Sequence, residues 1–281
     1  MITININPVA FLNVRWYSIA VTLAIIVIIL WLAWQVRKGA KISYDTVLTA
    51  AVVGIPSGII VSRLLHVIDN IVVAKLHPEL ALAGQVIDYT QHLGQIIRLD
   101  MGGLTIYGAV LGAALGIWVY SRFSKFQFGY LADLIVPGLI LAQAVGRVGC
   151  TINGCCYGLP TSLPWGIVYT HPDSLAHIGV AVHPTQVYEI IYLLIMFGVV
   201  LMLRRRLKHD GSLFLIYLVL YSAWRIGIDF LREGTPFFFG LHQAQFTGII
   251  VLAIAITLLV RTRWIKRGKG SISQPPEEAN N

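Results

Sequence analysis

The stretch YSIAVTLAIIVIILWLAWQV, residues 17–36, contains no charged side chain and is followed at once by Arg37 and Lys38. An α-helix rises about 1.5 Å per residue, so a helix of this length crosses the hydrocarbon core of a bilayer, which is about 30 Å thick. A polar segment precedes the stretch and no small-residue cleavage site follows it. We therefore expect a retained membrane helix and not a removed signal peptide.

Similar apolar runs recur along the whole chain. Of its 281 residues, 57% are hydrophobic and only 12% are charged, which is typical of an integral membrane protein and unlike a soluble domain. The sequence predicts an all-α integral membrane protein with seven transmembrane helices. The predicted spans are 17–36, 46–68, 102–120, 130–148, 184–203, 212–230 and 243–260.

Lysine and arginine residues set the predicted orientation. Fourteen of the 21 fall in connections on one side of a seven-helix bundle, and by the positive-inside rule this side is cytoplasmic. We expect the N-terminus outside and the C-terminus in the cytoplasm. The net charge of +8 then reflects topology and anionic lipid, so we expect no nucleic-acid partner. The fourteen residues are Arg37, Lys38, Lys41, Arg122, Lys125, Arg204, Arg205, Arg206, Lys208, Arg261, Arg263, Lys266, Arg267 and Lys269.

The predicted domain organisation is a single membrane domain, residues 1–267, followed by a disordered cytoplasmic tail, 268–281, that contains QPPEEANN. The domain has an outer arm at 1–16 and outer loops at 69–101, 149–183 and 231–242. Long loops on one face of a rigid scaffold often carry function. The outer face is therefore where we expect the functional site.

Charged residues near the outer helix ends form the candidate site. A charge inside a membrane helix costs at least about 2.5 kcal/mol, so it usually has a partner or a function. In HPTQVYE, residues 183–189, Glu189 needs a cationic partner because it lies in an apolar helix. In WRIGIDFLRE, residues 224–233, Arg225, Asp229 and Arg232 share one helix face. Together with Arg63 and Arg147, they form either an internal ladder of ion pairs or a site for a phospholipid phosphate, which arginine binds with planar paired donors.

Six motifs along the chain resemble those of the prolipoprotein diacylglyceryl transferase family. They are RWYSIA at 15–20, SRLLHVI at 62–68, MGGLTIYGAVLG at 101–112, GRVGCTINGCCYG at 146–158, HPTQVYE at 183–189 and WRIGIDFLREG at 224–234. Each motif alone is weak. All six occur in the order and spacing of the family, so the resemblance covers nearly the whole chain.

The resemblance implies a multi-pass enzyme of the bacterial plasma membrane, with its active site toward the outer leaflet. It would transfer the diacylglyceryl group of phosphatidylglycerol to the lipobox cysteine of a preprolipoprotein and release glycerol phosphate. The implied partners are phosphatidylglycerol, preprolipoprotein signal peptides and membrane lipids, with no cofactor. This reaction is an alkyl transfer, in which a thiolate attacks and a charged phosphate leaves.

Residue roles follow by motif match. The expected catalytic residues are Arg147 and Arg225, which would stabilise the phosphate and the leaving group, together with Tyr107, Asp229 and His183. The expected substrate-binding residues are Tyr17, Arg63, Asn153, Gly158, Gln186, Tyr188, Glu189 and Arg232.

The sequence departs from the common family pattern at three positions. Tyr107 stands where many members have a histidine, Cys150 where many have an asparagine, and Cys155 where many have a glutamate. The histidine is a natural general base. A phenol with a pKa near its reference value of about 10 is a poor base at neutral pH, so Tyr107 would instead hydrogen-bond the acceptor thiol, assisted by His183 or Tyr17.

Other classes of protein remain as alternatives. A paralogous phospholipid-dependent transferase, or a lipid-binding membrane protein, would use the same lipid site with another acceptor. A thiol or metal protein of the outer face would use Cys150, Cys155 and Cys156, but their spacing lacks a paired C-x-x-C, so we expect no metal. A structural disulfide from Cys150 to either of the others stays open. A transporter would show an inverted repeat or broken helices, and the sequence indicates neither.

Overall fold

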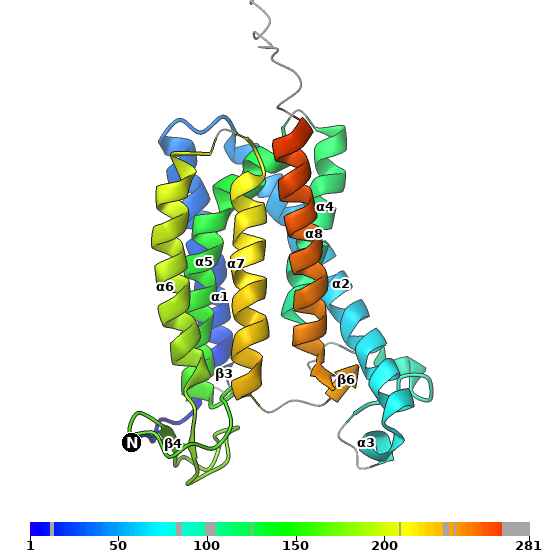
Figure 1. Ribbon diagram of the computed structural model, residues 1–281, viewed down its shortest axis with the longest axis vertical. Coiled ribbons are helices and arrows are strands. Elements are labelled where there is room, and N and C mark those ends of the chain that lie inside the picture. Colours follow the sequence, from blue (N-terminus) through cyan, green and yellow to red (C-terminus); the bar gives the residue numbers. More distant parts are fainter. Residues whose placement is uncertain are drawn as a thin grey trace, which may run out of the picture.

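A computed structural model describes residues 1–11, 14–82, 86–98, 105–124, 126–207, 209–232, 236–238 and 240–265. Long helices run side by side along the molecule, and short strands gather with the N-terminus at one end, which we call the strand end (Figure 1). The predicted tail at 268–281 and the start of the predicted third span, 102–104, lie outside the described residues.

Among the described residues, seven long helices form the bundle: α1 (Trp16–Arg37), α2 (Tyr44–Leu76), α4 (Ile106–Phe123), α5 (Phe128–Asn153), α6 (Thr185–Arg204), α7 (Ser212–Ile228) and α8 (Gln243–Ile265). In the described part of the chain, six of them, all but α4, are long and apolar enough to cross a membrane. Their outward faces expose large apolar side chains such as Leu30, Val52 and Ile60, which a bilayer would cover. This confirms an all-α membrane protein, while a seventh crossing by α4 stays a prediction.

Helix α4 packs against α2 through a face of glycines. A Cβ atom at Gly112 would lie 2.5 Å from the carbonyl oxygen of Ser57, and one at Gly108 would lie 2.9 Å from the backbone nitrogen of Ser62. Small residues at this spacing let two membrane helices bring their backbones together. The Ser62 hydroxyl also donates to the carbonyl of Thr105 at 2.7 Å, which ties the start of α4 to α2.

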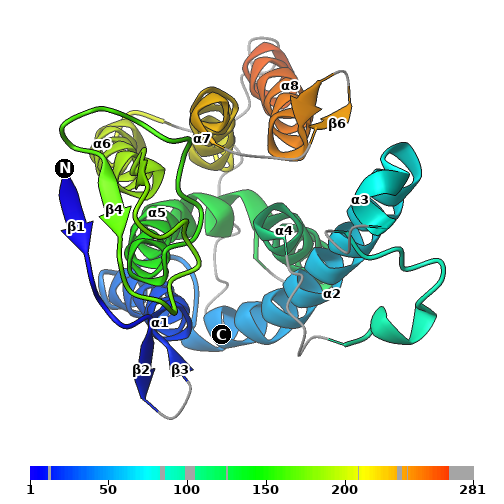
Figure 2. The ribbon, with the colours of Figure 1, turned by 90° about the horizontal axis from the view of Figure 1, so that it is seen from below.

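Helix α5 is the centre of the bundle. It contacts α1, α4, α6 and α7, and the view from the strand end shows it among these helices (Figure 2). Val136 and Ile140 of α5 are fully buried against Leu193 of α6 and Tyr217 of α7. At its end, Gly154 adopts a left-handed conformation with φ 69°, and the following amide, that of Cys155, donates to the carbonyl of Cys150 at 3.1 Å.

Small sheets cover the strand end. β1 (Ile2–Ile4) pairs in parallel with β4 (Ile167–Tyr169), which pairs antiparallel with β5 (Ala181–Val182). β2 (Val9–Phe11) pairs with β3 (Val14–Arg15), and β6 (Pro236–Phe238) pairs with β7 (Leu241–His242). Short helical pieces complete this end: α3 (Pro78–Leu82), η1 (Leu93–Gln95) and η2 (Asp229–Leu231).

Two segments predicted as loops are helical. α2 continues to Leu76, so Asp69 lies inside it and does not begin an outer loop. Residues 69–76 contain no helix breaker, and the helix ends at His77 because the residue before a proline disfavours helical geometry. α5 continues beyond 148 to Asn153 and stops only at Gly154. Both extensions bring charged or thiol side chains of the presumed loops onto rigid helices.

Basic residues gather at the end of the bundle opposite the strands. Arg37, Arg122 and Arg204 lie in the last turns of α1, α4 and α6, all of which end there (Figure 1). Lys125, Lys208 and the basic residues after 265 lie outside the described residues. The separation of the basic end from the strand end follows the predicted two-sided charge pattern.

Candidate active site

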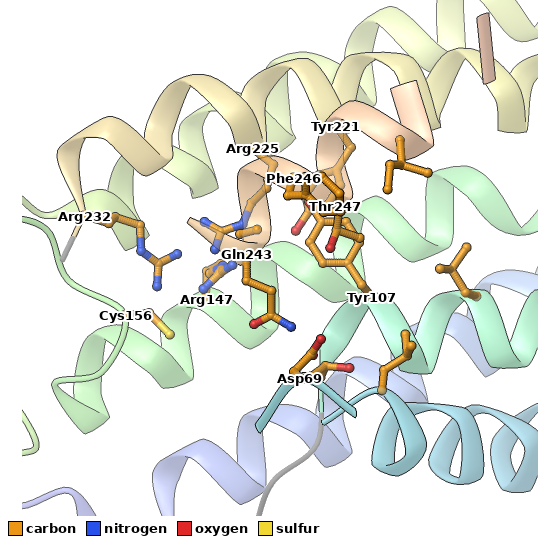
Figure 3. Close-up of a pocket in the computed structure, with 15 residues that line it drawn as sticks. Asp69, Tyr107, Arg147, Cys156, Tyr221, Arg225, Arg232, Gln243, Phe246 and Thr247 are labelled. Carbon is orange, nitrogen blue, oxygen red and sulfur yellow. The ribbon is translucent and has the colours of Figure 1, made fainter. Parts of the chain in front are cut away.

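A cavity of about 420 Å³ lies between α2, α4, α5, α7 and α8, in the half of the bundle nearest the strand end (Figure 3). Three arginines and an aspartate line it together with apolar side chains. A mixed lining of this kind suits a ligand with a charged head and apolar tails. The lining residues are Leu65, Asp69, Thr105, Tyr107, Leu111, Arg147, Cys156, Tyr221, Arg225, Arg232, Gln243, Ala244, Phe246, Thr247 and Ile250.

Arg147 enters the cavity from the last turns of α5 and is held by Glu189 of α6. Its Nη2 lies 2.9 Å from Oε2 of Glu189, and the two side chains are only 8% and 3% exposed. The other carboxylate oxygen of Glu189 accepts a hydrogen bond from the Tyr221 hydroxyl at 3.4 Å. The structure thus gives Glu189 the cationic partner that the sequence required, and this pair fixes the orientation of Arg147.

Arg225 enters from α7 and is held by Asp229, one turn further along. Its Nη2 lies 3.3 Å from Oδ1 of Asp229, and Nδ1 of His242 lies 2.9 Å from Oδ2 of the same carboxylate. Asp229 therefore orients Arg225, and His242, which the sequence motifs did not identify, contacts the same carboxylate. Arg232, beyond the end of η2, adds a third guanidinium (Figure 3).

Two buried donors at the cavity have no hydrogen-bond partner among the described residues. They are Nη1 of Arg225 and the hydroxyl of Tyr107. Leaving a buried donor unpaired costs about 1–3 kcal/mol, and more for a charged group. Both residues line the same cavity, so a ligand with acceptor oxygens would satisfy both groups at once.

Other predicted residues build the wall behind the cavity. Gln186 and Thr185, at the start of α6, donate to the carbonyl oxygens of Cys155 and Cys156, each at 2.8 Å. The Gly158 amide donates to the carbonyl of His183 at 2.9 Å, and a side chain at Gly158 would collide with the Leu231 carbonyl. Gln186, Gly158 and His183, which were predicted to bind substrate or act in catalysis, are not in the cavity lining of the described structure, and neither is Thr185, for which the sequence predicted no role. They hold the segment that follows α5.

Three more predicted residues lie at the edge of this wall. Asn153 accepts a hydrogen bond from Arg15 Nη1 at 3.0 Å, and Tyr17 at the start of α1 packs beside Gly149 of α5. The Tyr188 hydroxyl accepts a hydrogen bond from the Trp165 indole at 2.8 Å and lies 3.4 Å from Nδ1 of His183. Through these contacts the three residues stabilise the strand end.

Arg63 of α2 contacts the segment around η1. It donates to the carbonyl oxygens of Ile96 and Gln95 at 2.8 and 2.7 Å, and its guanidinium lies over the buried ring of Tyr89. These contacts attach the η1 segment to α2. The structure does not bring Arg63 into the cavity lining with the other three arginines.

The motif reading missed several residues of the cavity. Asp69 of α2 and Gln243 of α8 both line it, and Figure 3 shows the Gln243 amide extending toward Asp69. Asp69 follows the run LLHVI directly, and a carboxylate at that position could have indicated a site residue. It was not considered because the predicted loop began there. Gln243 and Ala244 begin the last helix and carry no motif.

The three cysteines lie together at the end of α5. Their sulfur atoms are all within 4.8 Å of one another, and all three are free thiols. Cys156 also lines the cavity. Hydrogen bonds from the thiols of Cys150 and Cys155, and then the positive charges of Arg147 and Arg232, hold the pKa of Cys156 below its usual range despite burial. Thiolate is the form of cysteine that binds soft metal ions.

Comparison with known proteins gives consistent matches over nearly the full chain. A family model described as "Prolipoprotein diacylglyceryl transferase" matches residues 3–261. A protein of Dehalococcoides mccartyi named phosphatidylglycerol--prolipoprotein diacylglyceryl transferase is 47% identical over 264 residues, which cover 92% of this chain and 95% of that protein. Proteins with the same name from Symbiobacterium thermophilum (33% identical; 95% of this chain, 92% of that protein) and Clostridioides difficile (32%; 94% and 96%) are also similar.

Proposed function

This chain belongs to the prolipoprotein diacylglyceryl transferase family, and we propose that its arginine-lined cavity is the place where the transfer occurs. The activity is transfer of the diacylglyceryl group of phosphatidylglycerol to the lipobox cysteine thiol of a preprolipoprotein. One S–C bond forms, one C–O bond breaks, and glycerol phosphate leaves. The site must therefore bind a phosphodiester, accept two acyl chains and admit a peptide thiol.

The observation that carries this proposal is the pair of unsatisfied buried donors. Arg225 on α7 and Tyr107 on α4 line one cavity, and Nη1 of Arg225 and the Tyr107 hydroxyl lack hydrogen-bond partners among the described residues. If the charged residues formed only an internal ladder of ion pairs, both of these donors would still be buried without a hydrogen-bond partner. A bound phosphate supplies acceptor oxygens for both, and hydrogen bonds to an ionised group are about twice as strong as those between neutral groups.

The arginines divide the work on the phosphate. Arg225 donates its free Nη1, and Arg147, oriented by Glu189, provides a second planar donor from the facing helix. As the C–O bond breaks, the phosphate gains a second negative charge, and donors already in place stabilise that charge without rearrangement. Arg232 stands nearest the strand end and adds positive potential there. Tyr107 donates a hydrogen bond and does not serve as the base.

The apolar lining receives the diacylglyceryl part of the substrate. Leu65 and Leu111 from α2 and α4, and Phe246 and Ile250 from α8, border the same cavity as the arginines. An acyl chain gains about 0.8 kcal/mol for each buried CH₂ group, so a lipid placed this way stays anchored while its head group reacts.

We also propose the orientation. The basic helix ends favour a cytoplasmic position for the end opposite the strands, and this puts the cavity toward the outer leaflet of the plasma membrane. α4 then crosses as a seventh helix and joins an outer segment to the cytoplasmic end. Fusions of alkaline phosphatase after residue 98 and after residue 124 test both points. Activity only at 98 supports them, and activity at 124 contradicts them.

The release of the head group tests the proposed chemistry. Purified protein in detergent is incubated with phosphatidylglycerol labelled in the terminal glycerol, with and without a lipobox peptide. We expect labelled glycerol phosphate only when the peptide is present. Release without peptide indicates a lipid hydrolase. No release, with lipid still bound, indicates a lipid-binding protein or a transferase for another acceptor, and either result overturns the proposal.

A further inference from the structure

The three cysteines of the chain form a cluster at the end of α5, and the chemistry proposed for the arginines gives this cluster no role. Their spacing lacks a paired C-x-x-C, and the sequence therefore predicts no metal site. In space, however, the three sulfurs lie within 4.8 Å of one another. Sulfur ligands about 2.3 Å from a tetrahedral zinc ion are about 3.8 Å apart, so small side-chain rotations bring all three to a shared ion.

The backbone around the cluster is fixed in advance. Gly154 reverses the chain with φ 69°, and Cys156 has φ 63°, a left-handed conformation that no other non-glycine residue adopts among those described. Such a conformation persists only where the surroundings hold it. Here Gln186 and Thr185 bind the carbonyls of Cys155 and Cys156. This arrangement turns both side chains toward Cys150, in the last turn of α5.

We propose that Cys150, Cys155 and Cys156 bind a zinc-like thiophilic ion, and that its fourth coordination position takes the acceptor thiol. The inference rests on the proposed function, because the acceptor is the lipobox cysteine. Catalytic zinc sites have three protein ligands and one open position. Cys156 borders the cavity, and Figure 3 shows its sulfur on the side of Arg147 and Arg232. The cavity is therefore the side from which a fourth ligand arrives.

The charges around the cluster fit an anionic centre. Three thiolates around a divalent ion carry one net negative charge, and a fourth thiolate adds another. Burying such a centre requires nearby cations. Arg147 and Arg232 line the same cavity as Cys156 and supply them, and Arg147 remains fixed by Glu189.

A metal ion bound here would account for deprotonation of the acceptor thiol, a step for which no residue has been assigned as the base. A thiol bound to zinc gives up its proton to solvent, since a coordinating thiol is deprotonated outright. The bound sulfur then attacks the glycerol carbon that carries the phosphate ester. The S–C bond forms, the C–O bond breaks, and its electron pair leaves with the glycerol phosphate. No atom is oxidised or reduced in this substitution, and Tyr107 need not act as a base.

Metal content and a cobalt spectrum test the site. Full-length protein is purified without chelator, and its zinc is measured by mass spectrometry. We expect about one zinc ion per chain, near-complete loss in Cys156→Ser, and no loss in His171→Ala, a histidine of the same outer loop. Cobalt-loaded protein should show a sulfur-to-metal charge-transfer band that shifts when the lipobox peptide is added.

Several results overturn the inference. They are zinc well below stoichiometry with no cobalt band, zinc retained in Cys156→Ser, or thiol counting that shows two cysteines oxidised to a disulfide in active protein. Full transfer activity after chelation to zero zinc also overturns it and leaves the proposed function intact. Bound zinc without any transfer contradicts the proposed function instead. Because chelation uses the wild-type chain, poor folding of a cysteine variant does not prevent the test.

Discussion

Arg147 on α5 and Glu189 on α6 form an ion pair of 2.9 Å with both side chains almost fully buried. This pair joins the central helix of the bundle to the helix that follows the cysteine segment. Removing one partner of a buried pair costs about 3–5 kcal/mol, because the other charge is left unpaired. The pair therefore stabilises the bundle and also fixes the orientation of the Arg147 guanidinium in the cavity.

Glu189→Gln is expected to lower both stability and transfer activity. The midpoint of thermal unfolding in detergent should fall, because Arg147 keeps its charge and loses its carboxylate. The double variant Arg147→Gln/Glu189→Gln should recover much of the stability and none of the activity. Thermal unfolding and peptide lipidation measured side by side check this, and wild-type values for Glu189→Gln would disprove the role of the pair.

Arg225→Lys is expected to reduce kcat by about 100-fold, the usual effect of removing one donor that stabilises a developing anion. Lysine keeps the charge but cannot offer Nη1 to the phosphate while it holds Asp229. The matched control is Arg261→Lys, an exposed arginine of α8 toward the opposite end of the bundle. Unchanged kcat in Arg225→Lys would refute the donor role.

Tyr107→Phe is expected to lose activity by about 10-fold or more without losing stability. Its hydroxyl is buried and unpaired among the described residues, so removing it relieves a cost in the free protein and removes a hydrogen bond to the bound phosphate.

Tyr217→Phe provides the contrast. The Tyr217 hydroxyl accepts a hydrogen bond from the Gln143 amide at 2.8 Å, so this variant should lose about 1 kcal/mol of stability and keep its activity. Thermal unfolding and initial rates distinguish the two tyrosines. Equal effects of both substitutions would contradict a ligand contact at Tyr107.

Gly158→Ala is expected to impair folding or activity strongly. A Cβ atom there would collide with the Leu231 carbonyl and lie 2.7 Å from the Cβ of His183, which would push the post-α5 segment away from the end of α7. Gly198→Ala, in α6 with no atom within 4 Å of the added carbon, should be neutral or slightly stabilising. Yield of folded protein in detergent checks both, and a well-folded, active Gly158→Ala would show that the close approach is dispensable.

Much of the fold was readable in the sequence because lipid imposes simple rules. Apolar length located the helices. The glycines of residues 108–116 allow the close packing of α4 on α2, but the structure was needed to identify α2 as the partner. Helix ends were less readable. The polarity of Asp69 suggested the start of a loop. The residue lies in α2 because no helix breaker follows it before the end of that helix at Leu76.

The sequence predicted which charged residues form the site. It did not predict which residues line the cavity and which only support it. Arg147, Glu189, Arg225 and Asp229 met as charge pairing requires, since each buried charge needs a partner. Spacing along the chain could not separate residues that line the cavity from residues that support it. Gln186 and Gly158 hold backbone, while Gln243 and Asp69, from distant helices, complete the lining. The sulfur cluster likewise depends on a left-handed turn at Gly154 that residue spacing alone does not reveal.

The mass of the acceptor peptide shows directly whether the transfer occurs. A synthetic lipobox peptide is incubated with purified protein and phosphatidylglycerol, and its cysteine is analysed by mass spectrometry. We expect one diacylglyceryl group attached to the sulfur by a thioether in wild type, and strongly reduced product with Arg225→Lys. Unmodified peptide after incubation with protein that still binds phosphatidylglycerol would contradict it.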